Sequence, residues 1–127
     1  MKACLRAAAL RSKQFEVTEK ARKVAAMETM LDEFEHRAHH LMRQIVEEEE
    51  RTGVKNCDDF AYSTFAKAAR LRRHNLLKSA EDLKIALYSA RREHENASSQ
   101  LSRLKSAPKF AEPPGAAVGA IIGADLL

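Results

Sequence analysis

The sequence predicts an all-α fold, an antiparallel two-helix coiled-coil hairpin with a short non-helical C-terminal tail. All three Pro and three of the four Gly lie at or beyond Pro108, so Gly53 is the one helix breaker before it. Apolar residues recur every 3.5 residues on average on both sides of Gly53. Aromatic residues make up only 6% of the chain and Trp is absent, which favours a long seam over a round core.

The first helix is predicted over about residues 5–52. One series of residues recurs every seven positions and is apolar throughout, and a second series follows it by three positions. Together they form an unbroken apolar seam from Val24 to Ile45 and a weaker one before Val17. The first series is Leu10, Val17, Val24, Leu31, Ala38 and Ile45, and the second is Lys13, Lys20, Met27, Phe34, Leu41 and Glu48.

A tight turn and a second helix over about residues 58–106 complete a hairpin that spans residues 1–107. Gly53 can take the left-handed conformation that ends a helix, and Asn56 and Asp58 are candidate N-caps. We expect a register in which Phe34 faces Leu76. The predicted second seam is Tyr62, Ala66, Ala69, Arg73, Leu76, Ala80, Leu83, Leu87, Ala90, His94, Ala97, Leu101 and Leu104.

The composition changes at Pro108, and residues 108–127 form a Pro/Gly/Ala-rich tail that we expect to be disordered. A tail that docks on a partner or touches a membrane is the alternative. Its apolar part is shorter than the ~20 residues that a membrane-spanning helix needs. Cys4 and Cys57 are expected to be free thiols in a reducing compartment.

Nothing in the sequence favours catalysis, a cofactor or a small-molecule substrate. There is no Gly-rich phosphate loop and no nucleophile with a plausible base, so we expect no enzyme and no catalytic residue. His36 and His40 are spaced as two metal ligands on a helix would be, with His39 beside them. No Cys or further ligand completes a tetrahedral site, so we expect a solvated histidine-rich face and no metal.

A partner-binding site is the sharper hypothesis for the region after the turn. Aromatic and arginine side chains together are typical of binding hot spots, and at least one aromatic should be exposed there. The alternative is that Phe60 and Phe65 cap the hairpin end. In the expected register the basic residues of this region lie close to Arg37, His40 and neighbouring basic residues of the first helix. This concentration of positive charge favours an acidic partner surface. The candidate residues are Phe60, Phe65, Lys67, Arg70, Arg72 and Arg73.

The acidic run over residues 47–50 and the net charge of the chain each allow more than one interpretation. The acidic run over residues 47–50 is either a solvated face or a recognition feature near the turn. The net charge of +4 is too mild for a dedicated nucleic-acid binder, and Phe65 is the one aromatic near the basic cluster that could stack on a base. A nucleic-acid-binding protein is therefore kept only as a lesser alternative.

Residues 47–54 read Glu-Glu-Glu-Glu-Arg-Thr-Gly-Val, residues 60–70 read Phe-Ala-Tyr-Ser-Thr-Phe-Ala-Lys-Ala-Ala-Arg, and residues 72–76 read Arg-Arg-His-Asn-Leu. The opening contains Lys-Gln-Phe-Glu-Val at residues 13–17 and Lys-Ala-Arg-Lys-Val at residues 20–24. With these stretches, residues 1–105 resemble the flagellar export protein family FliJ of the alphaproteobacterial type. Residues 60–70 carry the most specific part. The sequence departs from the family after Lys105, where a continuing charged helix is expected.

This resemblance implies a non-enzymatic coiled-coil stalk of the flagellar type III protein export apparatus. Its implied partners are the export ATPase ring, the export gate component and the export chaperones. Its implied location is the cytoplasm, peripherally at the inner-membrane export apparatus, and its implied context is flagellum biogenesis, motility and chemotaxis. A generic coiled-coil adaptor or regulator is the alternative function.

Overall fold

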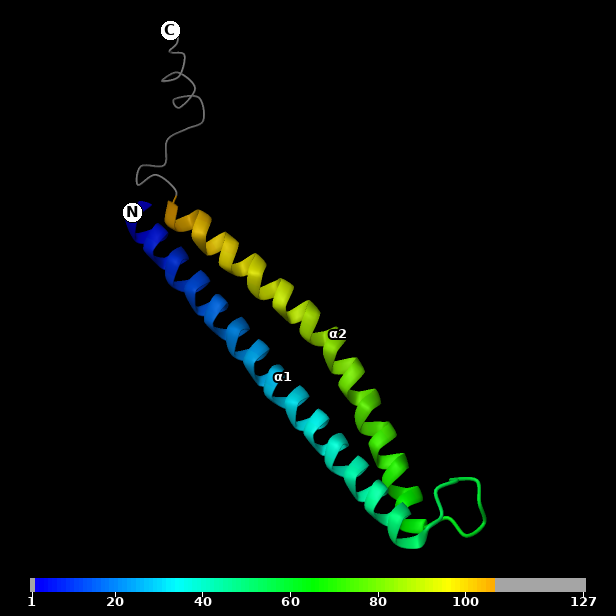
Figure 1. The fold of residues 1–127 in the computed structure, drawn as a ribbon. Coiled ribbons are helices and arrows are strands. Elements are labelled where there is room, and N and C mark those ends of the chain that lie inside the picture. The colour runs from blue at the N-terminus through cyan, green and yellow to red at the C-terminus, as the bar shows by residue number, and fades with distance from the viewer. Residues whose placement is uncertain (1, 107–127) are drawn as a thin grey trace. The chain divides into compact units, whose positions relative to one another are not determined.

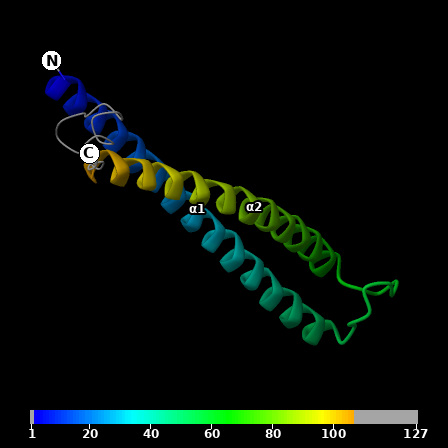
Figure 2. The ribbon, with the colours of Figure 1, turned by 90° about the horizontal axis from the view of Figure 1, so that it is seen from above.

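The computed structural model describes residues 2–106, which form two long α-helices joined by a loop (Figure 1). Helix α1 is Lys2–Thr52 and helix α2 is Thr64–Ser106. The helices run in opposite directions and pack against each other, so the predicted all-α antiparallel hairpin is confirmed (Figures 1 and 2). The predicted tail over residues 108–127 lies outside the described residues.

The chain divides into two compact units that are described separately. One unit is Lys20–His94, which holds the loop and the adjoining parts of both helices. The other joins Met1–Glu19 to Glu95–Leu127, of which residues 2–19 and 95–106 are described. The candidate site residues all lie in the first unit.

The two helices pack together along the two predicted seams. Each of the thirteen predicted positions of the second seam is buried or half-buried, and so is each predicted position of the first. The buried alanines on α2 let α1 approach closely, because a methyl group occupies little of the space between two helices. The most deeply buried of the seam residues are Ala38, Ile45, Ala66, Ala69, Ala80, Leu87, Ala90 and Ala97.

Ion pairs along one flank of the seam in Lys20–His94 fix the register. Arg91 Nη2 lies 2.7 Å from Glu28 Oε2, and Lys84 Nζ lies 3.6 Å from Glu35 Oε2. Moving seven residues along α1 thus moves seven residues back along α2, as an antiparallel coiled coil requires. A third pair, between Glu49 and Arg70, keeps this register two heptads further along.

This register corrects the expected pairing of Phe34 with Leu76. The pair Glu35–Lys84 brings Phe34 to the level of Ala80 and Leu83, about one helical turn from the expected partner. Leu76 lies instead beside Leu41, with which it lines one groove. The sequence could not settle this point, because a seam of repeated apolar residues is compatible with registers that differ by one turn.

The connection is longer than the predicted tight turn, because α2 begins at Thr64 and not at residue 58. Gly53 ends α1 as predicted, with a φ of 75° and its N–H donating to Glu49 O at 2.8 Å. The predicted caps Asn56 and Asp58 do not cap α2. Asn56 Oδ1 instead accepts from Asp58 N–H at 3.0 Å, and Asp59 Oδ1 accepts from Ala61 N–H at 2.8 Å. Such local turns compete with helix formation.

In the unit that joins the chain ends, polar side chains tie the helices together. Lys13 Nζ donates to Gln100 Oε1 at 2.7 Å and to Glu16 Oε1 at 2.8 Å. Arg6 Nη2 donates to Leu104 O at 2.9 Å, which satisfies a carbonyl in the last turn of α2. The lysine in the predicted seam is therefore accommodated by its flexible stem and by a polar partner on the other helix.

The register predicts which cysteine pair can be crosslinked within one molecule. With Cys4 and Cys57 replaced by Ser, the pair Met42→Cys and Leu77→Cys should react intramolecularly with a short bismaleimide, because both positions flank the seam at one level. The pair Met42→Cys and Tyr88→Cys, three turns apart in the register, should not. Non-reducing gels and mass spectrometry report the products, and a crosslinked dimer from the first pair would contradict the hairpin.

Candidate protein-binding surfaces

A network of three side chains, in which Glu49 and Tyr62 are buried and Arg70 is partly exposed, holds the loop end of the hairpin. Tyr62 Oη donates to Glu49 Oε2 at 2.7 Å, and Arg70 donates to both, through Nε to Tyr62 Oη at 2.8 Å and through Nη2 to Glu49 Oε2 at 3.1 Å. The Arg70 guanidinium also lies 5.8 Å from the centre of the Tyr62 ring. The network joins α1, the loop and α2, so it fixes where the loop returns to the helices.

A second network caps α2 and ties it to α1. Ser63 Oγ accepts from Ala66 N–H at 3.2 Å, and Ser63 O accepts from Lys67 N–H at 3.0 Å, so Ser63 is the N-cap. The same hydroxyl donates to Glu48 Oε2 at 2.5 Å. Arg51 holds that carboxylate from within α1, with Nη2 at 2.8 Å from Glu48 Oε2. One carboxylate therefore positions both the end of α1 and the start of α2.

These hydrogen bonds shift the acidity of the groups that make them. Hydrogen bonds from Arg51 and Ser63 lower the pKa of Glu48 from its ordinary 4.5 to about 2. Those from Tyr62 and Arg70 lower the pKa of Glu49. Burial, followed by the hydrogen bond to the Glu49 carboxylate, raises the pKa of Tyr62. Both carboxylates are therefore charged at neutral pH, and the charge is what holds the loop end together.

The predicted partner-binding residues do not form one surface. Some of them line two separate surfaces, and Arg70 also belongs to the network with Tyr62 and Glu49. Phe60, Lys67 and Arg70 line a hollow of about 630 Å³ against the loop, together with Asp58 and Asp59. Phe60 is fully exposed, and the Lys67 ammonium makes no hydrogen bond or ion pair within residues 2–106. This surface combines an aromatic ring with charges of both signs, which suits a polar protein partner.

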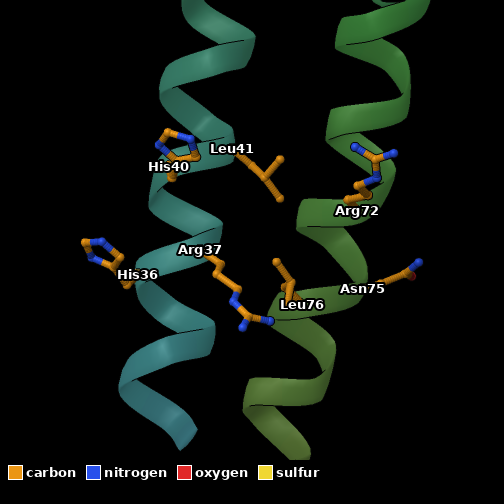
Figure 3. Close-up of a pocket in the computed structure, with 7 residues that line it drawn as sticks. All are labelled: His36, Arg37, His40, Leu41, Arg72, Asn75 and Leu76. Atoms are coloured by element: carbon orange, nitrogen blue, oxygen red, sulfur yellow. The ribbon is translucent and has the colours of Figure 1, made fainter. Parts of the chain in front are cut away.

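The second surface is a groove between α1 and α2, further from the loop (Figure 3). Its volume is about 700 Å³, and Arg72, Asn75 and Leu76 line it from α2. From α1 it is lined by His36, Arg37, His40 and Leu41. Leu41 and Leu76 point into the gap between the helices, and Arg37 reaches from α1 toward Leu76 (Figure 3).

The other predicted residues have mixed outcomes. Phe65 is half-exposed on α2, so the expectation of an exposed aromatic near the turn is confirmed for both Phe60 and Phe65. Arg70 contributes to the internal network, and Arg73 is half-buried on the seam with an Nε atom that has no hydrogen-bond partner within the described chain. Partner binding itself remains a prediction for all six residues.

Sequence reasoning missed the structural roles of Glu48 and Glu49. The acidic run had two interpretations, a solvated face or a recognition feature, and neither included binding to Tyr62 and Ser63. A signal was present, because Glu48 stands at a predicted seam position where a solvated carboxylate is not expected. His36 and Asn75 were likewise not predicted as part of the groove, although the meeting of Arg37 with the second basic run was.

The described residues contain neither a metal-binding cluster nor a membrane-spanning helix. Across residues 2–106, no three His, Cys, Asp or Glu side chains gather closely enough to hold a metal ion. Neither α1 nor α2 is apolar enough along its length to cross a membrane. Cys4 and Cys57 are exposed and unpaired by any disulfide within these residues.

Acidification is expected to loosen the loop end. Unfolded Glu48 takes up its proton near pH 4.5, whereas folded Glu48 does so only near pH 2, so stability falls as pH drops through this window. The melting temperature, followed by circular dichroism, should decline from about pH 4.5 to about pH 2. Glu48→Gln should flatten the decline, whereas Glu50→Gln should keep the wild-type profile. Identical profiles for wild type and Glu48→Gln would contradict this role.

The hydroxyl of Tyr62 is expected to stabilise the hairpin. Tyr62→Phe keeps the buried ring but removes two hydrogen bonds, at a cost of about 1 kcal/mol. Tyr88→Phe is the matched control, because Tyr88 is exposed and accepts one long hydrogen bond, from Arg92 at 3.3 Å. Urea denaturation should give a lower midpoint for Tyr62→Phe alone. Equal midpoints for the two variants would show that the network adds no stability.

Comparison with protein-family models, with curated proteins and with solved structures finds no match in any of the three. The fold and the two surfaces therefore carry the functional argument.

Proposed function

We propose that this chain is a non-enzymatic helical hairpin that binds other proteins, and specifically the coiled-coil stalk of the flagellar type III export apparatus. In this role it couples the export ATPase ring to the export gate and assists chaperone delivery, in the cytoplasm at the inner-membrane export apparatus. The general part of the proposal rests on the surfaces of the hairpin. The specific part rests on the resemblance of residues 1–105 to the FliJ family, of which residues 60–70 are the most specific stretch.

One observation carries the general part. Several charged side chains beside the seam in Lys20–His94 form ion pairs between the helices. The charged groups of Lys67, Arg37 and Arg72, in contrast, make no hydrogen bond or ion pair within residues 2–106. These free cations lie next to exposed or groove-lining apolar side chains. Unpaired charge beside accessible apolar surface is typical of a protein interface with an oppositely charged rim.

The hairpin architecture is compatible with the stalk. A stalk acts by reaching into one partner and presenting its side to another, and two packed helices supply a stiff element with long accessible flanks. A two-helix seam also has little interior in which to enclose a small substrate, which agrees with a role without catalysis. Outside residues 60–70 the sequence is generic coiled coil, so a coiled-coil adaptor or regulator in another assembly is the second candidate.

The proposal is tested by direct binding of the purified full chain to the export ATPase and the export gate component of the same organism. Phe65→Ala should weaken capture of at least one of them by tenfold or more, as loss of a hot-spot aromatic does. Phe15→Ala, which removes a more exposed ring from α1, should leave capture unchanged. Circular dichroism should give the same helix content for both variants.

The cellular arm of the test is motility. Deletion of the gene should impair swimming, and the wild-type chain should restore it better than Phe65→Ala does. Normal motility of the deletion strain, together with no binding to the ATPase or the gate, would rule out the stalk and favour the adaptor. Salt-sensitive binding of the chain to duplex DNA with no protein partner would favour the nucleic-acid alternative.

A further inference from the structure

The two flanks of the seam in Lys20–His94 carry different charges near the loop. One flank carries the ion pairs Glu28–Arg91, Glu35–Lys84 and Glu49–Arg70, with acids on α1 and bases on α2. The opposite flank pairs Lys20 with Glu93, but nearer the loop it carries two arginines, Arg37 on α1 and Arg72 on α2. These arginines line one groove in which no acidic residue compensates their charges.

The arginines line the groove of about 700 Å³ whose floor holds Leu41 and Leu76 (Figure 3). Neither guanidinium group makes a hydrogen bond or ion pair within residues 2–106, and no acidic residue lines the groove. The neighbouring Arg73 adds a third positive charge at this level, and its buried Nε has no hydrogen-bond partner there. The groove therefore combines an accessible apolar floor with an excess of positive charge and of unused donors.

We propose that this groove docks an acidic amphipathic helix of a partner protein. An apolar side chain of that helix rests on Leu41 and Leu76, and carboxylates on either side of it bind Arg37 and Arg72. Arginine suits this role because its planar guanidinium binds a carboxylate through two parallel hydrogen bonds. The inference rests on the proposed function as a protein-binding hairpin, and it does not depend on the export stalk.

Charge and shape favour a peptide over nucleic acid. Asp32 and Glu33 line the hollow next to the groove, on the far side of His36 and Arg37. A continuous phosphate backbone passing through the groove would meet these carboxylates, whereas a helix with localised acidic residues avoids them. The groove is lined by no Phe, Tyr or Trp ring on which a base could stack, and its apolar leucine floor does not complement a sugar-phosphate chain.

Peptide binding to the full chain identifies the ligand chemistry. A displayed library of 14-residue helical peptides is selected on the full chain, and the recovered peptides are measured by fluorescence anisotropy. They should combine an apolar stripe with Glu or Asp, and Arg37→Glu with Arg72→Glu should weaken their binding at least tenfold. Arg43→Glu with Lys78→Glu, the same charge change elsewhere, should weaken it less than threefold.

A charge swap supplies the decisive arm. Peptides in which the acidic residues become Lys should lose binding to the wild type and regain it on the Arg37→Glu, Arg72→Glu variant. Selected peptides without acidic residues, or binding indifferent to both arginines, would overturn the proposal. So would duplex DNA that binds more tightly than the peptides and depends on the same arginines.

The export ATPase and gate component, measured on the same variants, separate this inference from the proposed function. If these proteins bind normally while no acidic peptide uses the groove, the groove proposal alone is wrong. If acidic peptides use the groove while the ATPase and the gate do not bind the chain, the stalk is wrong and the groove stands.

Discussion

The antiparallel register between α1 and α2 is the constraint on which the rest of the structure depends. It is set where small side chains on α2 let the helices approach and where charges on the flanks match, as in Glu35–Lys84. A shift of one turn would keep the seam apolar, but it would separate those pairs. It would also move Leu41 away from Leu76, so the groove exists only in the observed register.

The loop end illustrates how a locally unfavourable sequence is stabilised by its partners. Acidic residues in the last turns of a helix oppose its dipole, and residues 47–50 carry four of them. Glu49 is nevertheless buried, because Tyr62 and Arg70 both donate to its carboxylate. Glu48 is held in the same way by Arg51 and Ser63. The carboxylates that would weaken an isolated helix therefore position the loop and start α2.

The charges that the hairpin leaves unpaired are the basis of the proposed binding. Glu28 is paired with Arg91 across the seam, whereas the side chains of Arg37 and Arg72 line a groove with an apolar floor and have no such partner within residues 2–106. A ligand that filled this groove would gain from both the charge and the apolar surface. Phe60, Phe65 and Lys67 lie closer to the loop, so the accessible aromatic and cationic side chains are spread along the hairpin and do not form one compact cluster.

The sequence alone determined the all-α hairpin, the two seams and the end of α1 at Gly53, because heptad spacing and helix breakers are local signals. It also predicted that at least one of Phe60 and Phe65 is exposed, and the structure shows that both are. Only the tertiary structure decided the register, the start of α2 at Thr64 and the division of the predicted site. Arg70 belongs to an internal network and Arg72 to a groove, although they are two residues apart. The physical reason is that a repeat defines which residues face a partner helix, whereas which residue each one meets depends on contacts between distant parts of the chain.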